Sequence, residues 1–168
     1  PHQIDNAGLA LMAFNSTRPC APDGIANAIW PGRVQKLDTG AIAAMWPYQP
    51  IWLDGAHNSH GATALAATLR TIHDGKWNVI CGALNTRDPA EFLLPLSQLA
   101  DRVACLTIPD QDASLSARDM SDAAKHLGLA ASPAATLAAS FDLLDQTAPV
   151  IICGSLYLAG HILIQNKT

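Results

Sequence analysis

Three short apolar runs, each followed by a segment with helical spacing, constrain the fold of this chain most. They lie within the strings WNVICGAL, RVACLTI and VIICGSL and contain several β-branched residues. Apolar runs of this length are typical of strands buried on both faces of a sheet, and alternation with helices indicates parallel strands joined by crossovers. The 168 residues suffice for one domain of ordinary size. The sequence therefore predicts a three-layer α/β domain with a mostly parallel sheet.

The other strands and the helix boundaries follow from local signals. Strands are predicted over residues 34–37, 42–46, 50–54, 77–82, 103–108 and 149–153. The first two should form a hairpin around Asp38-Thr39-Gly40, which would give the sheet an antiparallel edge. The helix after the strand at 50–54 should have one buried face, formed by Ala62, Leu65, Ala66, Leu69 and Ile72. Four further helices should begin at Asp88-Pro89, Ser116, Ser132-Pro133 and Ser155, and Pro95 should kink the first of these four.

Residues 1–31 differ from the remainder of the chain. Apolar residues recur at helical spacing from Ile4 to Phe14, and a second short helix is predicted from Asp23 to Ile29. Two such helices cannot hold a core of their own, so we place a domain boundary at Pro31-Gly32 and assign 1–31 to the end of a preceding domain. Because the chain starts at Pro1 in a helical pattern, we expect a piece of a longer protein.

Charge and cysteine usage limit the function classes. The formal net charge is −4 without a basic run, which argues against nucleic acid or an anionic membrane as a partner. There is neither a membrane-length apolar stretch nor an export signal. The four cysteines are far apart in the sequence and form neither a zinc motif nor a disulfide framework, so we expect a reduced, cytoplasmic protein.

The loop after the strand at 50–54 holds the densest group of polar side chains. Asp54, His57, Asn58 and His60 lie between that strand and the next helix. Ligands of open parallel sheets bind at the carboxyl ends of strands, where a carboxylate can accept from ribose hydroxyls and a helix N-terminus favours an anion. Alternatively, Asp54 and Asn58 only cap the turn and His57 is solvated.

Two further strand ends are candidates for the same site. The segment from Cys81 to Asp88 runs from a strand into a helix, although capping alone would account for Asp88 before Pro89. Gly154 and Ser155 also lie between a strand and a helix, so a ligand could approach the backbone or the hydroxyl closely, with helix capping as the alternative role of Ser155.

Metal and hydrolase chemistry have little support. His57 and His60 lack a third protein ligand nearby, so no metal site is predicted. Asp54, His57 and Ser155 are the residue types of a hydrolase triad, but Ser155 lacks the G-x-S-x-G context and the acid and base would share one loop.

Several strings taken in order resemble the C-terminal part of folylpolyglutamate synthase/dihydrofolate synthase, in the Mur ligase superfamily. The likeness covers essentially the whole chain and rests on Trp30-Pro31-Gly32-Arg33, Leu53-Asp54-Gly55-Ala56-His57-Asn58 and Gly154-Ser155-Leu156-Tyr157, supported by His2-Gln3-Ile4-Asp5-Asn6-Ala7 and by Gly82-Ala83-Leu84 with Arg87-Asp88. The resemblance implies a Rossmann-like C-terminal domain, with residues 1–31 ending a central ATPase domain.

The resemblance also implies a reaction and its partners. ATP, with Mg²⁺, would phosphorylate the carboxylate of dihydropteroate or a folate, and glutamate would attack the acyl phosphate. Asn6 matches a residue near adenine, Arg33 one that reaches the nucleotide, and Asp54 one that holds ribose. His57 and Ser155 match positions near the phosphates and the incoming glutamate, with His57 the candidate catalytic residue.

Departures from the family pattern limit what this chain can do alone. Ser59 replaces the usual proline, and Arg87 stands where lysine is usual. No phosphate loop exists, since the Gly75-Lys76 pair is followed by Trp77. The phosphate loop and the magnesium ligands should lie in the missing upstream domain, so we expect this chain to be inactive by itself. A peptidoglycan-precursor ligase and a non-catalytic Rossmann-like binding module remain the alternatives.

Overall fold

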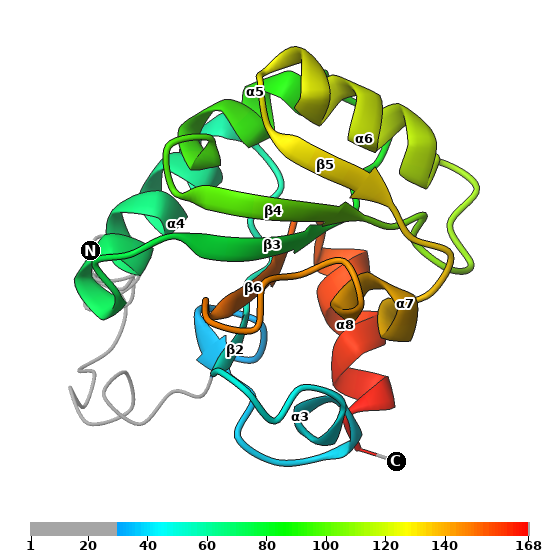
Figure 1. Ribbon diagram of the computed structural model, residues 1–168. Helices are drawn as coiled ribbons and strands as arrows, with labels where there is room; N and C mark the ends of the chain where they lie inside the picture. The colour runs from blue at the N-terminus through cyan, green and yellow to red at the C-terminus, as the bar shows by residue number, and fades with distance from the viewer. Residues whose placement is uncertain (1–29, 168) are drawn as a thin grey trace, which may run out of the picture. The chain divides into compact units, whose positions relative to one another are not determined.

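The computed structural model describes residues 30–167, and the chain divides into two units between Pro31 and Gly32. The second unit contains a six-stranded sheet with helices on both faces (Figure 1). Its strands are β1 (Gln35–Lys36), β2 (Ile51–Leu53), β3 (Trp77–Cys81), β4 (Ala100–Cys105), β5 (Ala130–Pro133) and β6 (Val150–Cys153). Its helices are α3 (Ala41–Met45), α4 (Ser59–Ile72), α5 (Pro89–Leu93), the 3₁₀ turn η1 (Leu94–Leu96), α6 (Ala117–His126), α7 (Leu137–Phe141) and α8 (Leu156–Gln165).

The strand order is β1-β2-β6-β3-β4-β5, with β1 antiparallel to β2 and all other neighbours parallel. The last strand along the chain, β6, therefore lies between β2 and β3. This arrangement confirms the predicted α/β class, with its mostly parallel sheet and antiparallel edge.

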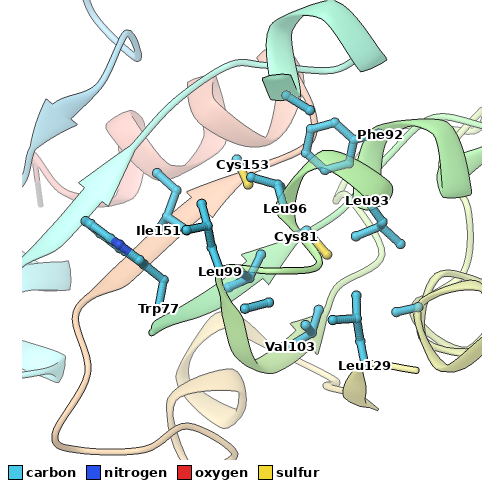
Figure 2. Close-up of a cluster of buried hydrophobic side chains, with 14 of the residues drawn as sticks. Trp77, Cys81, Phe92, Leu93, Leu96, Leu99, Val103, Leu129, Ile151 and Cys153 are labelled. Carbon is cyan, nitrogen blue, oxygen red and sulfur yellow. The ribbon is translucent and has the colours of Figure 1, made fainter. Parts of the chain in front are cut away.

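Two apolar layers cover the sheet. Side chains of α4, α5, η1 and α6 pack on one face, where Trp77, Leu96 and Ile151 are fully buried (Figure 2). Side chains of α3, α7 and α8 pack on the other face, where Ile80 and Ile152 are fully buried. All five residues of β3 are buried, as expected for a strand covered on both sides.

The predicted hairpin is wrong. Residues 41–45 form helix α3, and β1 pairs instead with β2, with Gln35 opposite Leu53. The Ala-Ile-Ala-Ala-Met run suits a helix, and burial of Ile42 against the sheet fixes it there. The antiparallel edge was thus predicted correctly but with the wrong partner strand.

Other boundaries also differ from the prediction. Ser132-Pro133 does not begin a helix; these residues end the edge strand β5, where a proline is tolerated, and Thr136 caps α7 instead. Ile72, expected on the buried face of α4, is 38% exposed. Pro95 lies in η1, so the chain tightens into a 3₁₀ turn after α5.

Candidate functional site

The carboxyl ends of β2, β6 and β3 form the place in this sheet where a ligand site is expected. The chain leaves β2 and β3 toward the helices of one face, α4 and α5, and leaves β6 toward α8 on the other face. Loops that diverge to opposite faces at adjacent parallel strands leave a crevice between them. The three polar loops identified from the sequence all begin at these strand ends.

Two glycines let the loops after β3 and β6 approach each other. Gly154 has a φ of +108°, and a Cβ atom there would lie 2.6 Å from the carbonyl oxygen of Gly82. A Cβ atom on Gly82 would lie 2.8 Å from the carbonyl oxygen of Leu106. Backbone therefore packs directly on backbone beneath the crevice, which no larger residue would allow.

A pocket of about 210 Å³ lies at these loops, with Gly154 in its lining. All three loops contribute to it. His57 comes from the first loop and residues 154–157 from the third, and the second contributes Ala83, Leu84, Thr86, Arg87, Asp88 and Pro89, with Phe92 of α5 beside them. The structure thus brings His57 and Ser155, which are distant in the sequence, into one pocket.

Ser155 both caps α8 and faces the pocket. Its residue is 3% exposed, and its Oγ accepts a hydrogen bond from the Tyr157 backbone N–H at 3.0 Å. The predicted capping role is therefore confirmed. Among the described residues no acceptor binds the hydroxyl hydrogen, so the same side chain can still donate to an anionic ligand.

His57 is exposed at the mouth of the pocket. Its Nδ1 lies 3.2 Å from the carbonyl oxygen of Gly55, a contact that makes Nδ1 the donor and leaves Nε2 open to a ligand. Asn58 next to it caps α4 by accepting from the Gly61 N–H at 2.8 Å, as the capping alternative predicted.

Asp54 is bound to backbone rather than open to solvent. The residue is 5% exposed, its Oδ1 accepts from the Ala56 N–H at 2.7 Å, and its Oδ2 accepts from the Val34 N–H at 2.8 Å. Both oxygens of this carboxylate therefore stabilise local structure, which is the turn-capping alternative. Contact of the same carboxylate with ribose stays a prediction.

Arg33 lies on the turn that Asp54 holds. The turn is unusual because Gly32 has a φ of +68° and Val34 a φ of +45°. The Gly55 N–H donates to the Gly32 carbonyl oxygen at 2.7 Å, which joins this turn to the loop after β2. Arg33 is half-buried, does not line the pocket, and has no hydrogen-bond or ionic partner among residues 30–167. Asn6 lies outside the described residues.

The loop after β3 contributes more side chains to the pocket than a role in helix capping alone would explain. Thr86, Arg87 and Asp88 are exposed and all three line it. Asp88 does cap α5, accepting from the Ala90 N–H at 2.9 Å. In the sequence, the only indication that this segment belongs to the site was its position at the end of a buried parallel strand.

The hydrolase triad is not assembled. The Asp54 oxygens accept from backbone amides, and His57 Nδ1 contacts a carbonyl oxygen rather than Asp54. The thiols next to the site are buried, which disfavours their thiolate forms. Burial, together with the charge of Asp54, raises the pKa of Cys153 well above its ordinary value, and a contact with Cys105 together with burial does so for Cys81.

The described residues provide no metal site. Nowhere in 30–167 do three His, Cys, Asp or Glu side chains gather closely enough to hold an ion. Within the same part of the chain, no helix is both long and apolar enough to span a bilayer.

Comparison with known proteins shows to which family this domain belongs. Residues 47–165 match the family model of the dihydrofolate synthetase C-terminal domain. A folylpolyglutamate synthase of Lacticaseibacillus casei is 33% identical over 142 residues, which cover 83% of this chain and 30% of that protein. The chain thus spans about a third of the length of this relative.

Solved structures of enzymes with related names share the fold of this chain. E. coli FolC in complex with DHPP and ADP superposes with a TM-score of 0.75 at 25% identity, covering 95% of this chain and 38% of that one. A bifunctional folylpolyglutamate synthase/dihydrofolate synthase with Mn, AMPPNP and L-glutamate bound gives 0.73 at 26% identity, with the same coverage of both chains. The chain belongs to the dihydrofolate synthetase C-terminal domain family.

Proposed function

We propose that this chain is the C-terminal part of an ATP-dependent ligase that joins glutamate to dihydropteroate or to a folate. The observation that carries the proposal is the pocket at the ends of β2, β6 and β3, which gathers residues of the family strings at 53–58, 82–88 and 154–157 into one site. Relatives with this domain are named folylpolyglutamate synthase, and related structures hold ADP or AMPPNP and L-glutamate.

In this proposal the domain forms one wall of the active site. Arg33 reaches the nucleotide, Asn6 lies near adenine, and Asp54 contacts ribose directly or orders the turn that carries Arg33. His57 and the Ser155 hydroxyl face the acyl phosphate and the incoming glutamate, with His57 Nε2 available to move a proton. Closure of such a wall over a bound nucleotide excludes water and orients the reactants.

The remaining machinery belongs to other parts of the polypeptide. ATP supplies the phosphoryl group, and Mg²⁺ would neutralise charge on its phosphates, which requires a phosphate loop and carboxylate ligands. The sequence contains no phosphate loop, and residues 30–167 gather no metal-ligand cluster. We therefore propose that an ATPase domain of the same polypeptide holds the metal and the phosphates.

The test uses the full-length protein with ATP, magnesium and L-glutamate. We expect ADP release to require glutamate together with dihydropteroate or tetrahydrofolate, and the product to gain the mass of one glutamyl group. Release with a UDP-linked muramoyl substrate instead would favour the peptidoglycan-ligase alternative. Absence of release with every acid acceptor would favour a non-catalytic binding module.

A second experiment tests whether this chain is inactive without the ATPase domain. The 168-residue chain alone should release no phosphate from ATP above the background measured without protein. Release that disappears in Arg33→Ala would place the catalytic machinery within this chain and contradict the proposal.

A further inference from the structure

The side chain of Gln35 holds the first residue of the turn at 32–34, which carries Arg33. Its Oε1 accepts a hydrogen bond from the Gly32 N–H at 2.9 Å. Gln35 itself lies in β1, where it pairs with Leu53, and its Nε2 group makes no hydrogen bond among residues 30–167. One acceptor atom therefore connects the edge of the sheet to this turn.

The backbone on the N-terminal side of Arg33 is fully hydrogen-bonded. Gly32 is buried, its N–H donates to Gln35, and its carbonyl oxygen accepts from the Gly55 N–H at 2.7 Å. Buried backbone groups that lose their partners cost free energy. Without the acceptor on Gln35, the Gly32 N–H would have to move toward water, and the turn would move with it.

The C-terminal side of Arg33 is held in a similar way. The Val34 N–H donates to Asp54 Oδ2 at 2.8 Å. Gly32 and Val34 both have positive φ angles, of +68° and +45°, and a β-branched residue such as valine rarely adopts such a conformation. The turn therefore needs its surroundings in order to persist, because strained backbone is kept only where neighbouring contacts fix it.

The side chain of Arg33 has no contact of its own that would fix its position. It is half-buried and has no hydrogen-bond or ionic partner among residues 30–167. Within this part of the chain, the backbone of the turn thus determines where the guanidinium group can reach. A misplacement of about 1 Å can already impair a group that orients a substrate.

We propose that Gln35 is a positioning residue of the nucleotide site, which acts through Arg33 and does not touch the ligand. The inference rests on the proposed function, because it uses the role given there to Arg33. Gln35 does not line the pocket at the ends of β2, β6 and β3, and none of the strings that resemble the family includes it.

Steady-state kinetics of the full-length ligase test this assignment. Gln35→Leu keeps the approximate size of the side chain and removes the acceptor, so the KM for ATP should rise by about three- to tenfold, the range expected for one lost hydrogen bond. The KM for L-glutamate should not change. Gln35→Ala should give the same result without adding apolar surface. Gln35→Glu keeps an acceptor oxygen and should restore most of the wild-type KM for ATP.

A double-mutant cycle separates positioning from a general effect on the fold. If Gln35 acts through Arg33, adding Gln35→Leu to Arg33→Ala should leave the KM for ATP at the value of Arg33→Ala alone. An equal rise in both backgrounds would overturn the inference, because Gln35 would then act independently of Arg33. A Gln35→Glu enzyme as impaired as Gln35→Leu would also overturn it, and so would an Arg33→Ala enzyme with the wild-type KM for ATP.

The matched control is Gln49→Leu. Gln49 is exposed and makes no hydrogen bond among residues 30–167, so its substitution should leave the KM values for ATP and L-glutamate unchanged. Equal increases of both KM values in Gln35→Leu would overturn the assignment to the nucleotide site.

Hydrogen exchange separates this inference from the proposed function. If the wild-type enzyme releases no ADP with any acceptor, the ligase proposal fails, and exchange in the 168-residue chain decides on Gln35. The amides of Gly32 and Val34 should be protected in wild type and in Gln35→Glu, and should lose protection in Gln35→Leu while the amides of β3 keep theirs. Unchanged protection of Gly32 and Val34 in Gln35→Leu would overturn the inference.

Discussion

The carboxylate of Asp54 holds the backbone of Val34, twenty residues earlier in the chain, through a 2.8 Å hydrogen bond from the Val34 N–H. Val34 is β-branched and has a φ of +45°, a conformation that such residues rarely adopt. The strained turn therefore persists because a buried acceptor fixes it. Since Arg33 precedes Val34 directly, the position of the arginine depends on this contact.

Asp54→Ala should lower the free energy of unfolding by about 2 to 4 kcal/mol, because two hydrogen bonds to a buried carboxylate are lost together. Urea denaturation of the chain measures this. Asp112→Ala is the control, since Asp112 is exposed and makes no hydrogen bond or ion pair among residues 30–167. Normal stability with a raised KM for ATP in the full-length enzyme would instead support direct contact of Asp54 with ribose.

Gly154→Ala should destabilise the domain by about 2 to 4 kcal/mol. A φ of +108° is strained for alanine, and the new methyl group would meet backbone 2.6 Å away. Gly160→Ala is the matched control, because nothing lies within 4 Å of a Cβ atom at that helical position. Alanine there should stabilise α8 by about 0.5 to 1 kcal/mol. A Gly154→Ala protein as stable as wild type would show that the two loops can separate at little cost.

The sequence predicted those parts of the fold that depend on local signals. Asp88, Ser116 and Ser155 cap helices as expected, and β2, β3 and β6 lie within the predicted strands. The strand predicted at 103–108 lies three residues earlier, as β4, and the edge strand β5 was not predicted. The hairpin failed because the pairing of β1 is decided by which distant strand is available, and the sequence alone does not show that Gln35 meets Leu53. The three loops of the pocket were predicted, but which of their side chains line it appears only in three dimensions.

Asn78 is a structural residue that sequence analysis did not single out. It is fully buried in β3, where its Nδ2 donates to the carbonyl oxygens of Asp145 and Ala148 at 2.7 and 2.9 Å and its Oδ1 accepts from the Asp145 N–H at 3.0 Å. Asn78→Ala should cost about 2 to 4 kcal/mol of stability, because buried backbone groups lose their partners. In thermal or urea unfolding the exposed Asn85→Ala should match wild type. A small effect of Asn78→Ala would mean that water replaces the amide.

Asp145 should make folding sensitive to acid. Hydrogen bonds from the Thr147 hydroxyl and backbone N–H lower the pKa of Asp145 below its ordinary value. A carboxyl with a lower pKa in the folded state stabilises the fold above its unfolded pKa, and this stabilisation is lost as the pH falls through the folded pKa.

Thr147→Val tests this relation. The variant keeps the backbone N–H and removes the hydroxyl, so the pKa of Asp145 measured by NMR should rise toward its ordinary value. The variant should be less stable than wild type at neutral pH, and the difference should shrink as acid protonates Asp145 in both proteins. A stability difference that does not vary with pH would mean that Thr147 acts through packing alone.

The place of β6 in the sheet has a consequence for synthesis on the ribosome. Among the six strands of this sheet, β6 is translated last, and it alone connects β2 to β3. Until residues 150–153 leave the exit tunnel, the nascent chain holds two separate sheet fragments with open edges facing each other. Non-local strand pairing of this kind slows folding. A chain whose synthesis stops before residue 150 would therefore lack the centre of its sheet, which makes it a substrate for chaperones and proteases.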